Sequence, residues 1–149
     1  MRPDAALLVQ AGLRPTRQRS AILRAMEGRR RPVTAQALHA KLARPGRAGR
    51  SGPADGPGLA TVYRTLQALE HAGLVRTFPA GEGEIAYKLC QPGHHHHLIC
   101  ERCGRVVEIP SCEVEEWAAQ VAARRGFVVS SHQADIYGVC EQCVEGGAA

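Results

Sequence analysis

Apolar residues in the first half of the chain recur at the spacing of amphipathic helices. Residues 16–27 and 34–43 each begin with a threonine that can cap the first helical turn, and their apolar side chains share one helical face. Residues 59–73 continue the pattern and end on a glycine, a common helix terminator. The apolar stripe of this segment consists of Val62, Leu66 and Leu69. The pattern therefore predicts three helices.

Two short strand-like runs follow the last of these helices. LVRTF (74–78) and EIAYKL (84–89) flank the glycine-rich turn AGEG. Three helices and then a two-stranded hairpin indicate a winged helix-turn-helix, whose last helix enters the major groove of DNA. Residues 44–58, between the second and third helices, contain five Gly, three Pro and three Arg and are predicted to form a flexible basic loop.

The back half has a different pattern. HLIC (97–100) and RVVEI (105–109) are predicted strands, residues 113–126 form an amphipathic helix, and residues 127–140 form a final strand region. This describes a small α+β module with little capacity for a core of its own. We expect it to dimerise, to bind metal, or to do both.

Charge is divided unequally between the two halves. Residues 1–76 hold 14 Lys and Arg against 4 Asp and Glu, whereas residues 77–149 hold 5 against 10. All six cysteines and the run of four histidines lie in the acidic half. A basic front half and an acidic, Cys- and His-rich back half favour a nucleic-acid-binding domain joined to a metal-binding module.

The chain shows no feature of a membrane or secreted protein. No stretch approaches the roughly 18 to 20 apolar residues of a membrane span. The N-terminal residues lack the apolar core and cleavage site of a signal peptide. We therefore expect a cytoplasmic protein with no membrane partner, in which reduced cysteines serve as metal ligands rather than as disulfides.

Two matched cysteine pairs carry the strongest chemical signal. Cys100 and Cys103 form one C-x-x-C pair, and Cys140 and Cys143 form another, with 36 residues between the pairs. Each pair can direct two sulfurs at one ion, and two pairs complete a tetrahedral, all-thiolate zinc site of the structural kind. A redox dithiol would need only one pair and would leave the other unexplained.

Four sequence motifs resemble the ferric uptake regulator family of metal-sensing repressors. They are TRQRSAIL, GLATVYRTLQALEHAGLV, HHHHLICERCGRVVEI and the closing CEQC, and the resemblance spans residues 7–143. It implies an α+β chain with an N-terminal winged helix-turn-helix DNA-binding domain and a C-terminal α/β dimerisation domain. In this chain the domains would be residues 1–89 and 90–149, with wing and hinge at 77–90.

The four consecutive histidines can serve two metal sites, because neighbouring side chains of a strand point to opposite faces. The resemblance implies a regulatory site near the hinge made of Cys90, His95 and His97. Its fourth ligand stays open between Glu108, which matches an acidic position of the family, and Glu82 or Glu84. The resemblance implies a second regulatory site as well. Its residues are His94, His96, Glu115 and His132.

The donor atoms and one missing residue favour zinc as the sensed metal. A soft thiolate at Cys90 suits zinc better than iron(II) or manganese, whereas imidazoles with a carboxylate accept all three metals. Iron-sensing relatives resemble one another in a histidine just before the helix that begins here at Thr34, and this chain has RRRPV there. The alternative is an iron-, manganese- or peroxide-sensing repressor of the same family.

His39, His71 and Cys112 are assigned no role.

The resemblance also implicates residues that contact DNA. Tyr63 can pack on a thymine methyl group, and Arg64 can reach a base edge or a phosphate. Arg14 can enter a narrow AT-rich minor groove, while Arg17 and Arg19 are expected to contact phosphates. The expected operator is double-stranded, two-fold symmetric and AT-rich.

These observations predict a homodimeric, zinc-responsive transcriptional repressor of zinc-uptake genes, with two to three zinc ions in each protomer. A zinc hydrolase is the rival from another class, since three protein ligands and an open position resemble a catalytic site. The chain has no H-E-x-x-H motif and no evident general base, and the basic winged helix would have no role. We therefore expect that it is not an enzyme.

Overall fold

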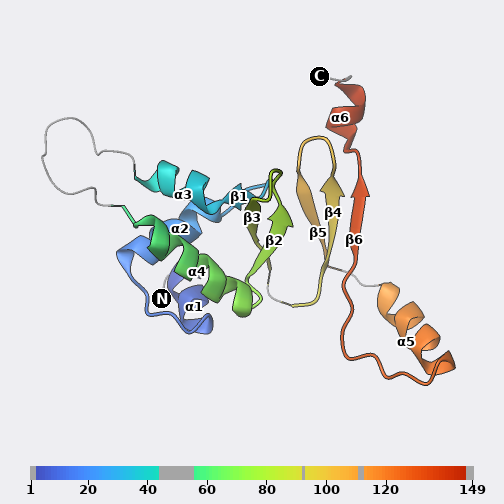
Figure 1. Cartoon of the computed structure of the whole chain (residues 1–149). Helices are drawn as coiled ribbons and strands as arrows, with labels where there is room; N and C mark the ends of the chain where they lie inside the picture. Colours follow the sequence, from blue (N-terminus) through green and yellow to red (C-terminus); the bar gives the residue numbers. More distant parts are fainter. Residues whose placement is uncertain (1–2, 44–55, 92, 111–112, 147–149) are drawn as a thin grey trace, which may run out of the picture. The chain divides into compact units, whose positions relative to one another are not determined.

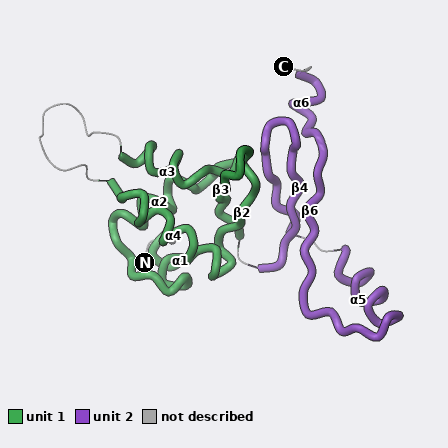
Figure 2. Tube along the Cα trace, viewed as in Figure 1, with its two compact units in different colours: residues 1–92 green, residues 93–149 purple. Residues whose placement is uncertain are grey.

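The computed structural model describes residues 3–43, 56–91, 93–110 and 113–146. The chain divides into two compact units, residues 1–92 and residues 93–149 (Figure 2). Most of the predicted basic loop, residues 44–55, lies outside the described residues, as does Cys112. No helix among the described residues is long and apolar enough to cross a membrane.

The first unit combines helices with a small sheet (Figure 1). Its sheet has the order β1-β3-β2, and both pairings are antiparallel. The elements are α1 (Pro3–Gln10), α2 (Arg17–Met26), β1 (Val33–Thr34), α3 (Ala35–Leu42), α4 (Leu59–His71), β2 (Val75–Pro79) and β3 (Ile85–Leu89). The expected three helices and hairpin are present, whereas α1 and β1 were not predicted because both are short and weakly patterned.

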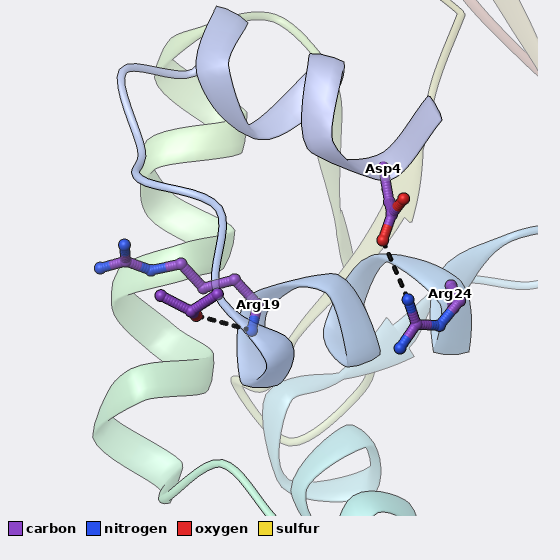
Figure 3. A network of polar contacts seen from close by, with 4 residues as sticks. Asp4, Arg19 and Arg24 are labelled. Atoms are coloured by element: carbon purple, nitrogen blue, oxygen red, sulfur yellow. Dashed lines mark hydrogen bonds and ion pairs between the residues drawn. The ribbon is translucent and has the colours of Figure 1, made fainter. Parts of the chain in front are cut away.

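Local sequence explains where these helices begin and end. The Thr16 side chain accepts a hydrogen bond from the Arg19 backbone N–H at 3.3 Å (Figure 3), and the Thr34 side chain accepts one from Ala37 at 3.1 Å. Both are N-caps, as the sequence predicted. Gly73, just beyond α4, has a φ of +70°, a left-handed conformation that glycine adopts without strain.

Buried apolar residues from all four helices hold the first unit together. Each fully buried aliphatic side chain contributes about 1.5 to 3 kcal/mol relative to leaving it exposed. The completely buried members of this core are Leu8, Ile22, Leu23, Ala35, Leu38, Val62, Leu66 and Leu69. The predicted stripe of α4 is therefore confirmed as a core face.

An ion pair joins α1 to α2 at the edge of this core. Arg24 Nη1 lies 2.9 Å from Asp4 Oδ2 (Figure 3), and the Asp4 side chain is only 6% exposed. A hydrogen bond from Ser20 lowers the pKa of the Asp4 carboxyl, and the charge of Arg24 lowers it further, against an opposing effect of burial.

The second unit is a three-stranded sheet with two helices. The strand order is β5-β4-β6, in which β4 pairs antiparallel with β5 and parallel with β6. The elements are β4 (His96–Cys100), β5 (Val106–Ile109), α5 (Val114–Arg124), β6 (Asp135–Gly138) and α6 (Glu141–Glu145). The predicted strand region at 127–140 was too long, since only its last part pairs with β4, and α6 was not predicted.

Large apolar side chains remain exposed in the second unit. None of the residues of α5 is buried, and Trp117 is 63% exposed. Phe127 is 72% exposed and Val128 is 96% exposed. Soluble monomers rarely leave so much apolar surface in contact with water. The sequence-based expectation that this module needs further stabilisation agrees with this exposure.

Candidate metal centres

The four cysteines of the matched pairs lie together in the second unit. Cys100 ends β4 and Cys103 lies in the turn that follows, whereas Cys140 and Cys143 lie at the start of α6. The parallel pairing of β4 with β6 places Cys100 beside Gly138, and this register brings the two C-x-x-C turns to the same end of the sheet. The four sulfur atoms lie within 4.8 Å of one another.

The sulfur geometry fits a tetrahedral ion. A Zn–S bond of about 2.3 Å in a tetrahedron separates two sulfurs by about 3.8 Å. The sulfur atoms of Cys103 and Cys140 lie 3.7 Å apart. All five cysteines that the structure describes are free thiols, so no disulfide competes for these sulfurs. The donor set therefore fits zinc, as the sequence predicted.

Backbone hydrogen bonds prepare part of this site for a metal. The backbone N–H of Cys140 lies 3.3 Å from the Cys100 sulfur and, with the N–H groups around Cys103, lowers the pKa of the Cys100 thiol to about 6. The pKa of Cys103 is also lowered, chiefly by the N–H of Arg105. By contrast, the hydrogen bond with Cys140 raises the pKa of Cys143 to about 12. A cluster of four thiolates needs a cation, because their charges repel one another.

A second cluster contains three histidines of the same unit. His94 Nε2 and His132 Nε2 lie 3.0 Å apart. The ring of His96 packs beside both, with its centroid 4.8 Å from that of His94 and 5.2 Å from that of His132. Burial, and then repulsion from the neighbouring imidazoles, lower the pKa of His96, which favours the neutral form that binds metals.

The structure does not bring Glu115 into this cluster. Glu115 lies in the first turn of α5, and the group of converging donors contains only His94, His96 and His132. No residue of α5 is buried, so packing within the protomer does not hold this helix against the histidines. The carboxylate of the predicted second site therefore stays a prediction.

The other two histidines point to the opposite face of β4. The rings of His95 and His97 have centroids 4.8 Å apart, and His97 is completely buried. His97 stands opposite Glu108 on β5 and opposite Asp135 on β6. The predicted division of the histidine run into two pairs is thus present.

The predicted regulatory site includes a residue of the first unit. Cys90 directly follows β3, and its backbone N–H donates to the Leu74 carbonyl at 2.9 Å. Because Cys90 and the two histidines belong to different units, their meeting at one ion stays a prediction. Glu82 and Glu84 lie in the exposed turn at the far end of β3. At about 3.3 Å per strand residue, Glu84 is about 20 Å from Cys90, too far for both to bind one ion.

The predicted DNA-binding residues lie on α2, α4 and the segment before α2. Arg64 is exposed on α4, whereas Tyr63 is half-buried and packs partly against the core. The Arg19 guanidinium donates to the Arg14 carbonyl at 2.8 Å. In this structure Arg19 therefore supports the backbone of Arg14, a role that the sequence did not predict.

A model of the ferric uptake regulator family matches residues 10–137. The chain belongs to the ferric uptake regulator family. Its members are transcription regulators and not enzymes, so this chain is a metal-responsive transcriptional repressor, and the rival hydrolase is excluded.

Relatives and solved structures of the family agree with this assignment. The zinc uptake regulation protein of Mycobacterium tuberculosis is 44% identical over 133 residues, covering 89% of this chain and 96% of the relative. The ferric uptake regulation protein of Campylobacter jejuni is 33% identical, covering 92% of this chain and 83% of the relative. A zinc uptake regulator complexed with zinc and DNA has a TM-score of 0.67 at 30% identity and covers 97% of this chain and 92% of the solved one. The expected α+β fold is confirmed.

Sequence reasoning missed one residue beside a predicted metal ligand. Asp135 Oδ1 lies 3.3 Å from His97 Nδ1. The two residues are far apart in the chain, and only the parallel pairing of β4 with β6 places them side by side. No motif in the sequence predicts this pairing.

Proposed function

We propose that this repressor senses zinc and silences zinc-uptake genes when zinc is plentiful. The proposal rests on the donor set expected for the regulatory site, in which a thiolate from Cys90 would join the imidazoles of His95 and His97. Sulfur and nitrogen donors favour zinc over iron(II) and manganese. The 44% identity to a zinc uptake regulation protein supports the same choice.

The two kinds of cysteine have different tasks in this proposal. The thiolates of Cys100, Cys103, Cys140 and Cys143 would hold a permanent zinc that cross-links the sheet to α6. The Cys90 thiolate would bind zinc reversibly with His95, His97 and Glu108. Of the three glutamates considered as the fourth ligand, we propose Glu108, because it stands beside His97 across the β4–β5 pairing. The histidines 94, 96 and 132 would form the second regulatory site.

DNA would be recognised by a two-fold symmetric dimer. The exposed apolar residues of α5 and of the segment after it would be buried between the two second units. Arg64 on α4 would then enter the major groove, and Arg14 an AT-rich minor groove. Regulatory zinc would stabilise the arrangement in which two recognition helices match one operator. DNA must then raise zinc affinity by the factor by which zinc raises DNA affinity, typically 5- to 150-fold.

The test is DNA binding at controlled concentrations of free metal. A labelled duplex from the promoter of a neighbouring transport operon would be titrated by fluorescence anisotropy, with zinc, manganese and anaerobic iron(II) buffered in parallel. Protein that carries only its four-cysteine zinc should respond to zinc at far lower free concentration than to the other two metals. An equal response to iron or manganese would instead identify an iron- or manganese-sensing repressor and contradict the proposal.

A further inference from the structure

The carboxylate of Asp135 lies beside His97, one of the predicted zinc ligands. Asp135 Oδ1 is 3.3 Å from His97 Nδ1; the His97 side chain is completely buried and that of Asp135 is 23% exposed. The strand pairings produce this contact, since His97 on the central strand faces Glu108 on one side and Asp135 on the other. Residues that stand opposite each other in a sheet share a face, so these three side chains form a row.

The Asp135 carboxylate lies beside Nδ1 of the His97 imidazole. The two ring nitrogens of an imidazole are separated by one carbon and point in different directions, so a ring whose Nδ1 faces Asp135 presents Nε2 elsewhere. His95 also has an oxygen beside its Nδ1, since this atom lies 2.9 Å from the Gly93 carbonyl oxygen. The Gly93 oxygen is placed to accept a hydrogen bond from His95 Nδ1–H, whereas the Asp135 oxygen lies within ion-pair distance of His97 Nδ1 without the geometry of a hydrogen bond. A carboxylate oxygen this close still favours a proton over a lone pair on Nδ1, which leaves the Nε2 lone pair available to a metal.

We propose that Asp135 is a positioning residue for the regulatory zinc site: it holds the proton of His97 on Nδ1 and thereby aims Nε2 at the ion. The inference rests on the proposed function, in which His97 is a zinc ligand. Asp135 is not among the converging donors of any metal group in the described residues, so it acts through His97 rather than as a ligand. Carboxylates that orient ligating histidines typically change metal affinity 10- to 100-fold.

The first experiment reads the imidazole directly and needs no regulatory zinc. Full-length protein with only the four-cysteine zinc would be labelled with ¹⁵N histidine and studied by long-range ¹H–¹⁵N correlation at pH 8, where imidazoles are neutral. The wild type should show His97 in the Nδ1–H form. Asp135→Ala should shift His97 toward the Nε2–H form that free imidazole prefers. An unchanged His97 signal in Asp135→Ala would overturn the inference.

The second experiment measures the consequence for zinc. Zinc affinity would be measured by competition with a chromophoric chelator in a His132→Ala background, which removes the other histidine cluster. Asp135→Ala should weaken the regulatory site 10- to 100-fold. Asp135→Asn, which keeps an oxygen in the same place, should weaken it less. The four-cysteine zinc should be retained in every variant.

The matched control is Glu116→Ala, which removes one negative charge from α5, where Glu116 accepts a hydrogen bond from Gln120 at 3.4 Å. Affinity in Asp135→Ala within twofold of wild type, or an equal loss in Glu116→Ala, would contradict the inference. If wild-type protein bound no zinc beyond the four-cysteine site, the proposed function and the positioning role would both fail. The imidazole spectra would then still decide whether Asp135 orients His97.

Discussion

The sulfur atoms of Cys103 and Cys140 lie 3.7 Å apart although 36 residues separate them in the chain. The parallel pairing of β4 with β6 produces this proximity, because it aligns the ends of both strands. A metal bound there would connect the first and last strands of the second unit and α6. A module with so few buried apolar residues depends strongly on such a cross-link.

Replacing Cys103 with serine should therefore unfold the second unit. A serine hydroxyl cannot replace the thiolate, and the metal-binding free energy is also folding free energy in small metal-dependent domains. We expect loss of the tightly held zinc, loss of dimer and reduced circular dichroism. Zinc content, gel filtration and circular dichroism measure these changes. A zinc-loaded Cys103→Ser dimer would show that the site is not structural.

Replacing Cys90 with serine should instead leave the fold intact and remove the response to zinc. Cys90 lies outside the four-cysteine cluster, so the variant should keep its four-cysteine zinc, its dimer and its unfolding temperature. Zinc-dependent DNA binding should be abolished, which anisotropy with buffered zinc would detect. A monomeric or unfolded Cys90→Ser protein would refute this separation of roles.

Stability should fall in acid because of Asp4. The carboxyl has a lower pKa in the folded chain than its ordinary value of 3.8, so its contribution is fully present above about pH 4. That contribution is lost as the pH falls through the lower folded-state pKa. Asp4→Asn should therefore be less stable than wild type in urea unfolding at pH 7, and the difference should shrink at pH 3. A difference independent of pH would assign the effect to packing instead.

The role of Arg19 can be distinguished from that of a phosphate contact. Its guanidinium donates to the Arg14 carbonyl, so Arg19→Ala should weaken DNA binding by loosening the Arg14 segment. The salt dependence of binding should remain unchanged. A direct phosphate contact would instead reduce the slope of log affinity against log salt by about 1. Anisotropy titrations between about 50 and 200 mM salt measure the slope.

Arg64→Ala is the matched comparison for Arg19→Ala. Arg64 is exposed on α4 and no intramolecular hydrogen bond of its side chain is found among the described residues. Loss of a base-edge contact should weaken the free energy of DNA binding by about 1 to 3 kcal/mol and relax specificity at one operator position. Competition with singly substituted duplexes would measure that change. Equal loss of affinity on every duplex would indicate a phosphate contact instead.

The sequence alone predicted helices α2, α3, α4 and α5, the hairpin, the threonine caps and the four-cysteine cluster, because each depends on local spacing or on residue types with a narrow range of roles. The division of the four histidines into two alternating pairs could also be predicted, since neighbouring strand residues point to opposite faces. Tertiary structure decided what depends on strand register. The parallel β4–β6 pairing places Asp135 beside His97, and the length of β3 separates Glu84 from Cys90. Register arises from packing of distant segments, and no local pattern in the chain encodes it.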